Sequence, residues 1–175
     1  MRLDRARQDA SYRAAAAEFG AAISRLARGY EADPELRADL VQEIHLALWR
    51  SLAAFDGRCA LATWVYRVAH NTAASHVARR TKAERLASLE ALEQLQDDDD
   101  PEAVVDSRRR LERLTALVGA LAPADRQVVL LYLEDMDAAA IGEITGLSAG
   151  AVAVKIHRLK RLLSRRFQEG DLHGR

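Results

Sequence analysis

FDGRCALATWVYRVAHNTAASHVARRTK, the stretch from Phe55 to Lys82, has the most distinctive pattern in this chain. It carries no acidic residue after Gly57, although several arginines and one lysine follow, and its aromatic residues gather near its start. Apolar and small residues recur at helical spacing and predict one buried stripe, made by Leu61, Val65, Val68 and Thr72. The stretch is therefore predicted to be a basic, amphipathic helix.

A second face of this helix has the chemistry of a nucleic-acid contact. Residues three or four apart share a helix face, and this face holds Trp64, Arg67, Asn71, Ser75 and Arg79. Cations attract phosphates, amides pair with base edges, and aromatic rings stack on unpaired bases. In the alternative interpretation the tryptophan fills a gap in the core and the arginines are merely solvated. The stretch by itself leaves both interpretations open.

The composition of the 175 residues favours helices. Hydrophobic residues make up 49%, with only 9 glycines and 3 prolines. The 26 Lys and Arg residues balance the 26 Asp and Glu residues, so only the distribution of charge is informative. The single cysteine, Cys59, excludes an internal disulfide and a multi-cysteine zinc site. With no apolar run of membrane-spanning length and no signal-peptide core, we expect a cytoplasmic protein without membrane insertion or cofactor.

Two helices are predicted before the basic stretch. The first covers residues from about Gln8 to Tyr30, and the second begins with Asp33 as cap and Pro34 at the first helical position. The outer side of the second helix combines carboxylates with exposed apolar residues, namely Asp39, Gln42, Glu43, Leu46 and Trp49. Such a surface suits a basic partner with an apolar centre, although helix-surface carboxylates are ordinarily just solvated.

An acidic stretch follows the basic one. Between Glu84 and Glu102 the net charge is −7, and the stretch ends in the run from Asp97 to Asp100 before Pro101. This composition is typical of a solvated, flexible linker. Calcium binding is not expected, because the run lacks the alternating ligands and turn glycine of a calcium loop.

The rest of the chain predicts a second helical unit with a helix-turn-helix. A short helix follows Asp137, Thr145-Gly146-Leu147 forms a tight turn, and Ser148 caps a final helix. From Ser148 to Arg166 there are six cations and no acid. A basic second helix in this position suits the major groove of DNA.

Three blocks in this order resemble the extracytoplasmic-function (ECF) class of bacterial RNA polymerase sigma factors. They are DLVQEIHLALWR (Asp39–Arg50), FDGRCALATWVYRVAHNTA (Phe55–Ala73) and LAPADRQVVLLYLEDMDAAAIGEITGLSAGAVAVKIHRLKRLL (Leu121–Leu163). The expected fold is all-α, with two small helical domains at residues 1–82 and 100–170 joined by an acidic flexible linker at 83–99. The second domain contains the helix-turn-helix.

The resemblance implies a role for each surface. Core RNA polymerase is expected to contact Asp39, Gln42, Glu43, Leu46 and Trp49. The minus-ten promoter element is expected to melt against a loop and helix, with one base entering a pocket beside Asn71. The residues implied there are Gly57, Arg58, Cys59, Ala60, Leu61, Trp64, Tyr66, Arg67, Asn71, Arg79 and Arg80. The minus-thirty-five element is expected to contact Ser148, Lys155, His157, Arg158 and Arg161. The family also implies an anti-sigma protein as partner.

One departure from the family pattern affects the last helix. Members usually continue after the cap as Gly-Thr-Val-Lys-Ser-Arg, whereas this chain has Ala151, Ala153 and Val154 at three of the polar positions. Base reading then relies on Lys155, His157, Arg158 and apolar contact with thymine methyl groups, or binding is mostly to phosphate.

No catalytic constellation is expected, because the histidines are scattered and Cys59 has no evident base. Two other functions fit parts of the sequence. A stand-alone helix-turn-helix regulator leaves the Asp39–Trp49 face and the Trp64–Asn71 cluster without a role. A sigma-like decoy that binds an anti-sigma factor is favoured only by the apolar start of the last helix.

Overall fold

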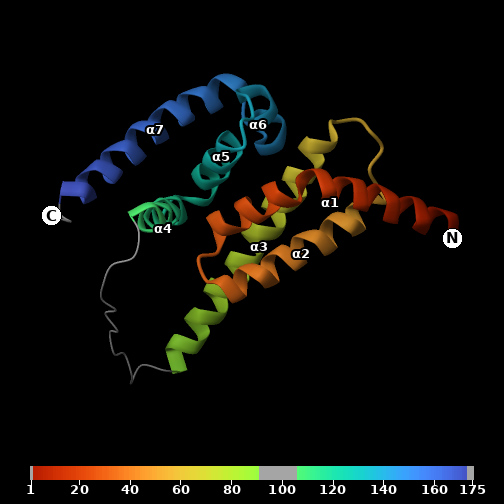
Figure 1. The fold of residues 1–175 in the computed structure, drawn as a ribbon, viewed down its shortest axis with the longest axis horizontal. Coiled ribbons are helices and arrows are strands. Elements are labelled where there is room, and N and C mark those ends of the chain that lie inside the picture. Colours follow the sequence, from red (N-terminus) through yellow and green to blue (C-terminus); the bar gives the residue numbers. More distant parts are fainter. Residues whose placement is uncertain (1, 91–105, 173–175) are drawn as a thin grey trace.

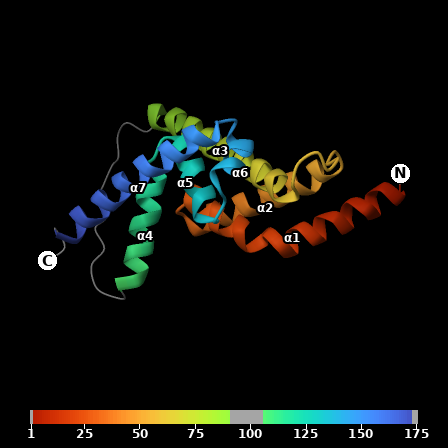
Figure 2. The ribbon, with the colours of Figure 1, turned by 90° about the horizontal axis from the view of Figure 1, so that it is seen from above.

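The computed structural model describes residues 2–90 and 106–172, with side-chain surroundings for 5–80 and 111–165. Within these ranges the chain forms seven α-helices and no strand, which confirms the all-α prediction. The two ends of the described chain lie at opposite ends of the molecule (Figure 1 and Figure 2).

The first unit consists of α1 (Arg2–Tyr30), α2 (Pro34–Leu52) and α3 (Leu61–Glu90), which pack side by side. Figure 2 shows the start of α1 extending beyond the other two helices. The core draws one stripe from each helix: Ala15, Phe19, Ile23, Leu26, Leu40, Ile44, Leu48, Val65 and Ala69. Burying a leucine or isoleucine side chain contributes about 1.5–3 kcal/mol, so the inner side of α2 is a main source of stability.

Local signals set the start of α2 as predicted. The Asp33 carboxylate accepts hydrogen bonds from the backbone N–H groups of Glu35 at 2.8 Å and Leu36 at 3.0 Å, and Pro34 occupies the first turn. These bonds satisfy two of the backbone donors that a helix start leaves without partners.

Two helix boundaries differ from the predictions. The first helix begins at Arg2 instead of about Gln8, and α3 continues to Glu90, so residues 83–90 of the predicted linker are helical. Ala, Glu, Arg and Leu are good helix formers, and in 83–90 this propensity outweighs the acidic composition that suggested a linker. The remaining linker residues, 91–99, and the predicted start of the second domain at residue 100 lie outside the described residues.

The second unit consists of α4 (Asp106–Gly119), α5 (Pro123–Leu133), α6 (Ala138–Thr145) and α7 (Ala149–Leu172). Asp137 caps α6 through the N–H of Ala140, and Gly146 ends it with φ of 79°. Ser148 Oγ accepts from the N–H of Ala151 at 3.2 Å. The predicted helix-turn-helix, formed by α6 and α7, is therefore present.

Gly142 makes the tight turn of this motif possible. A Cβ atom at position 142 would lie 2.6 Å from the backbone oxygen of Leu147, closer than a real side chain can approach. The absence of a side chain lets the turn fold back onto α6.

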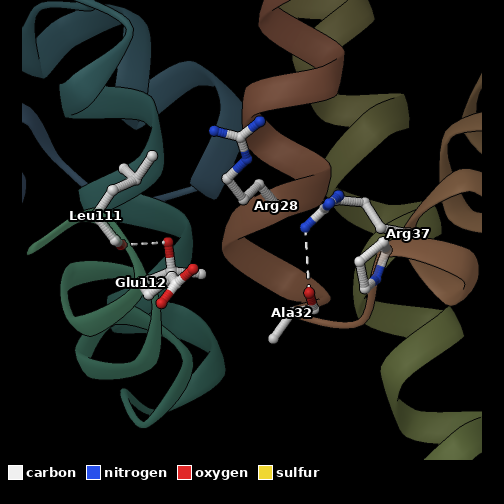
Figure 3. Close-up of a pocket in the computed structure, with 7 residues that line it drawn as sticks. Arg28, Ala32, Arg37, Leu111 and Glu112 are labelled. Atoms are coloured by element: carbon white, nitrogen blue, oxygen red, sulfur yellow. Dashed lines mark hydrogen bonds between the residues drawn. The ribbon is translucent and has the colours of Figure 1, made fainter. Parts of the chain in front are cut away.

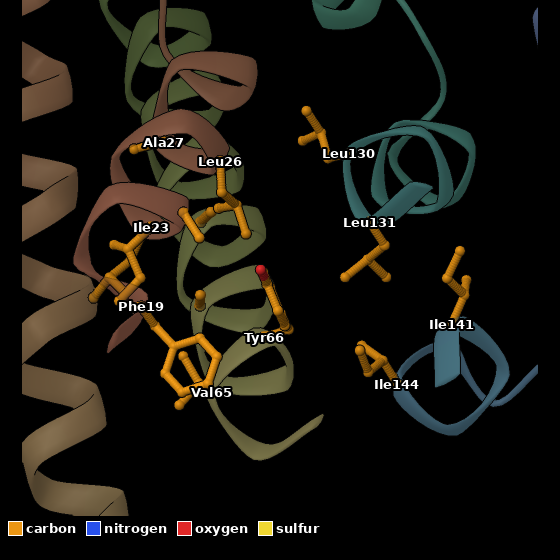
Figure 4. Close-up of a cluster of buried hydrophobic side chains, with 14 of the residues drawn as sticks. Phe19, Ile23, Leu26, Ala27, Val65, Tyr66, Leu130, Leu131, Ile141 and Ile144 are labelled. Carbon is orange, nitrogen blue, oxygen red and sulfur yellow. The ribbon is translucent and has the colours of Figure 1, made fainter. Parts of the chain in front are cut away.

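The two units pack against each other and share one apolar cluster. Figure 4 shows side chains of α1 and α3, including Leu26 and Tyr66, facing Leu130 and Leu131 of α5 and Ile144 of α6. Leu130 lies directly over Gly29, and the Arg126 guanidinium lies 5.4 Å from the centre of the Tyr30 ring. The sequence did not predict this contact, which we call the seam.

No single helix within the described residues is long and apolar enough to cross a membrane. By length and composition alone the bent pair formed by α6 and α7 passes the same test, with an angle of 104° between its two helices.

Candidate nucleic-acid interface

The outer side of α2 carries the residues predicted to contact the polymerase. Asp39 and Gln42 are exposed, and Leu46 is 47% exposed, whereas Leu40 and Ile44 on the opposite side are fully buried. The helix therefore presents carboxylate, amide and apolar groups on its free side.

Two of the predicted polymerase contacts are partly engaged within the chain. The Glu43 carboxylate accepts a hydrogen bond from Arg79 Nη2 at 2.6 Å and lies 3.4 Å from His76 Nδ1. The Trp49 ring is half-buried, and its Nε1 donates to Asp9 Oδ1 at 2.8 Å. Trp49 thus anchors α2 to α1. The sequence had predicted that its side chain would be exposed on the outer side of the helix.

The loop before α3 is held by aromatic packing. The Phe55 and Trp64 rings lie 5.4 Å apart, and Trp64 Nε1 donates to Ser51 Oγ at 3.1 Å. Gly57, with φ of 77°, turns the loop. Several residues predicted for the base pocket are exposed here: Gly57, Arg58 and Ala60; Cys59 and Leu61 are half-buried.

On α3 the predicted promoter-binding residues separate into two groups. Asn71 and Arg79 are exposed, as is Ser75 between them. Tyr66 is buried in the seam, and Arg67 donates from Nη2 to the backbone oxygen of Glu143 at 2.6 Å. Arg80 pairs with the buried Glu31 carboxylate. The structure thus leaves the Asn71 side open, while the second unit covers the Tyr66 side.

Two glutamates of the second unit hold this side of α3, and neither is predictable from the sequence pattern. Glu134 accepts two hydrogen bonds from Arg25, at 2.7 and 2.6 Å, and one from the Tyr66 hydroxyl at 3.4 Å. The Glu143 carboxylate accepts from Thr63 Oγ1 at 3.3 Å. Burial and the Glu134 carboxylate raise the pKa of Tyr66 to about 12, so the hydroxyl remains a hydrogen-bond donor.

Helix α7, the predicted recognition helix of the helix-turn-helix, has distinct inner and outer sides. Val152 and Leu159 are buried against the unit, whereas Val154 is 72% exposed and His157 and Arg161 are exposed. Two of the cations predicted to contact DNA, Lys155 and Arg158, are engaged with Asp125 of α5. The outer side is therefore more apolar than the cation count of the helix suggests.

Some titratable groups serve the core. His70 is buried, its Nδ1 lies 2.9 Å from the Tyr30 hydroxyl, and burial lowers the pKa of His70 to about 3. Among the described residues there is no group of three or more His, Cys, Asp or Glu that could hold a metal ion.

A cleft of about 320 Å³ lies where the end of α1 and the start of α2 face α4. Figure 3 shows Arg28 and Arg37 on one side of this cleft and Leu111 and Glu112 on the other. Arg37 donates to the Ala32 carbonyl at 3.2 Å. The cleft is part of the seam and is lined by two arginines, one glutamate and several apolar side chains.

Comparison with known protein families assigns both units. The family model of sigma-70 region 2 matches residues 16–83, and that of sigma-70 region 4 matches residues 111–163. Together these matches cover more than half of the chain. The chain therefore belongs to the sigma-70 family of transcription initiation factors, which are not enzymes.

Named relatives narrow the class. The chain is 29% identical over 140 residues to the ECF RNA polymerase sigma-E factor of Haemophilus influenzae, covering 74% of each chain. It is 29% identical over 156 residues to the RNA polymerase sigma factor CnrH of Cupriavidus metallidurans, covering 85% of this chain and 82% of the relative. It is an ECF-type sigma factor, which confirms the family predicted from the three blocks.

Solved structures support the fold. CnrH in complex with the cytosolic domain of CnrY has a TM-score of 0.69 at 20% identity, covering 96% of this chain and 97% of that one. The sigma factor RpoE in complex with the anti-sigma factor NepR from Bartonella quintana has a TM-score of 0.59 at 17% identity, covering 87% and 92%.

Proposed function

We propose that this sigma factor binds core RNA polymerase through the outer side of α2 and directs initiation at promoters with two separated elements. The observation that carries the proposal is the exposure, within the region 2 match, of acidic α2 groups and of Asn71 on the neighbouring helix α3. Asp39, Gln42 and Leu46 would form the polymerase contact, with Glu43 joining once Arg79 and His76 release it.

Melting of the minus-ten element is assigned to the Asn71 side of α3. Asn71 lies two helical turns after Trp64, whose ring is fixed by Phe55 and Ser51. Extruding a base from the duplex costs a few kcal/mol, which contacts to the base must offset. The exposed Asn71 amide supplies such a contact, and the turn at Gly57–Ala60 leads into the start of α3, in the first turn of which Trp64 lies.

The minus-thirty-five element is assigned to the outer side of α7. Val154, His157 and Arg161 are exposed along this side, and Ser148 caps the helix start. This side offers apolar surface for thymine methyl groups and a cation for phosphate or guanine.

The seam has to open for both elements to be bound. Their names place them about 25 base pairs apart, roughly 85 Å of B-DNA at 3.4 Å per base pair. In this structure, however, the two units are in contact, and Arg67 and Thr63 of α3 form hydrogen bonds with Glu143 of α6. We therefore infer that polymerase binding separates the units and releases Tyr66 and Arg67 for promoter DNA.

We also propose a protein antagonist of the anti-sigma type. Two solved structures of similar fold are complexes. RpoE is bound to the anti-sigma factor NepR, and CnrH is bound to the cytosolic domain of CnrY. In this chain the cleft lined by Arg28, Arg37, Leu111 and Glu112 crosses the seam, and its two arginines outnumber its one carboxylate. An acidic amphipathic segment bound there would hold both units and keep the chain closed.

Substitution of Asn71 tests the proposed function. Asn71→Ala should leave polymerase binding intact, because the docking side lies on α2, but should reduce open-complex formation roughly ten- to a hundredfold for a contact of about 1–3 kcal/mol. Permanganate reactivity of thymines on duplex and pre-melted templates measures this. The defect should shrink on the pre-melted template, since the base is already unpaired.

Ser24→Ala is the control, because Ser24 is an exposed side chain of α1, outside the faces proposed to contact DNA or polymerase. Normal opening of duplex promoters by Asn71→Ala would show that base capture does not involve this side of α3.

A further inference from the structure

Lys155 does not lie on the outer side of the recognition helix. It follows Val152 by three residues and precedes Leu159 by four, and both of these neighbours are buried. Only 23% of the Lys155 side chain is exposed. Its position therefore belongs to the inner side of α7, which faces α5.

Asp125, in the first turn of α5, accounts for this position. Its carboxylate binds the Lys155 ammonium through Oδ1, and Arg158 Nη2 lies 3.2 Å from Oδ2. The Asp125 side chain is 17% exposed. One carboxylate thus engages two recognition-helix cations from the side away from the outer face.

A simpler role for Asp125 is to stabilise the start of α5. Ala122 gives this helix no side-chain cap, and a carboxylate in the first turn interacts favourably with the helix dipole. That role explains an acid in the first turn, but it does not require contact with two cations on another helix.

We propose that Asp125 is a specificity-determining positioning residue for upstream DNA, because it withholds Lys155 and restrains Arg158 from phosphates. This inference rests on the proposed contact of α7 with DNA. The outer side that remains carries Ala151, Val154, His157 and Arg161. Because fewer cations of α7 are available to bind phosphates, a larger share of the DNA-binding free energy depends on base contacts.

The proposal predicts a gain of non-specific binding when the Asp125 charge is removed. Each additional phosphate contact steepens the slope of log K against log salt by about 0.9, so release of one or two cations steepens it by about 1–2. The discrimination between a preferred and a scrambled duplex should fall at the same time, because phosphate contacts are insensitive to sequence.

The experiment uses the full chain and fluorescence anisotropy over a series of salt concentrations. The probes are a short duplex enriched by the parent chain from a random pool and a scrambled version of it. Asp125→Asn and Asp125→Ala are the test variants, and alanine also favours the helix. Asp135→Asn is the charge-matched control: Asp135 is an exposed carboxylate of the same unit, at a φ of 57° that asparagine tolerates.

Steeper slopes and reduced discrimination for both Asp125 variants, with Asp135→Asn like the parent, are the expected result. The salt slope of the double variant Asp125→Asn with Lys155→Met should be less steep than that of Asp125→Asn by about 0.9, because one released cation is removed. Slopes and discrimination equal to those of the parent would overturn the inference and leave Asp125 as a helix-start residue. Absence of duplex binding by the parent, alone or with core polymerase, would instead overturn the α7–DNA contact itself and the inference with it.

Discussion

Arg25 and Glu134 are 109 residues apart in the sequence, yet the two side chains form a bidentate pair across the seam, with distances of 2.7 and 2.6 Å. Glu134 is mostly buried and also accepts from the Tyr66 hydroxyl. This carboxylate therefore links α1, α3 and the end of α5.

Glu134→Gln should loosen the seam, because a neutral amide cannot form the charge-assisted pair with Arg25. We expect longer distances between spin labels placed on the two units, and tighter binding of a single-stranded minus-ten oligonucleotide by the isolated chain. Asp135→Asn removes the neighbouring exposed carboxylate and should change neither measurement. Unchanged distances in Glu134→Gln would mean that apolar contacts alone hold the seam.

Reversal of charge on α2 should abolish polymerase binding. Asp39→Lys with Glu43→Lys replaces two attractive groups by repulsive ones, which costs several kcal/mol where the contact is desolvated. Co-purification with core enzyme measures the loss, and circular dichroism should show unchanged helicity. Glu35→Lys, an exposed charge reversal on the same helix, is the control. Retained co-purification of the double variant would place the docking surface elsewhere.

Two glycines of the helix-turn-helix should respond oppositely to alanine. Gly142→Ala puts a Cβ 2.6 Å from the Leu147 backbone oxygen, and such overpacking lowers the free energy of unfolding by about 1–3 kcal/mol. Gly150 has open space around it at the start of α7, so Gly150→Ala should be neutral or stabilising by up to about 1 kcal/mol. Thermal unfolding followed by circular dichroism compares the two, and equal melting temperatures would contradict the turn geometry.

Stability should fall as the pH drops from about 6.5 towards 5. The pKa of His70 in the folded chain is about 3, below the ordinary value of 6.5, because burial disfavours the charged ring. The unfolded chain therefore binds the proton more readily in this range, and the free energy of unfolding decreases by roughly 2 kcal/mol. Burial lowers the pKa of His45 as well, with the same sign.

His70→Phe should flatten this pH dependence in urea titrations, leaving the contribution of His45. His157→Gln, which changes an exposed histidine, should keep the parental slope. An equal slope in His70→Phe would show that His70 does not titrate on unfolding.

Local structure was predictable from the sequence, whereas pairing between distant residues was not. Asp33, Asp137 and Ser148 act on backbone groups two or three residues away, so their spacing alone identifies the helix starts. Glu134 with Arg25, and Asp125 with Lys155, depend on how whole helices pack. Spacing along one helix placed Arg67 on a DNA-facing side and gave no sign that Glu143 of another helix would meet it.

The same difference between local and long-range contacts separates the predicted site residues into two groups. Asn71, Asp39 and Gln42 are exposed, as their proposed roles require, because the periodicity of a single amphipathic helix decides the exposure of each. Tyr66, Trp49 and Lys155 are engaged by other elements, and only the assembled fold reveals this. The seam also leaves no compositional signal, since its residues are ordinary apolar and charged side chains.

Mapping of transcript starts determines whether this chain directs RNA polymerase to promoters. Purified core enzyme with the chain should transcribe genomic DNA of the source organism from discrete sites that share an upstream and a downstream element. Core enzyme alone should not start transcription at these sites, and neither should core enzyme with the double variant that carries both Asp39→Lys and Glu43→Lys. If the parent chain co-purifies with core enzyme but adds no discrete start sites, the chain does not direct RNA polymerase to promoters.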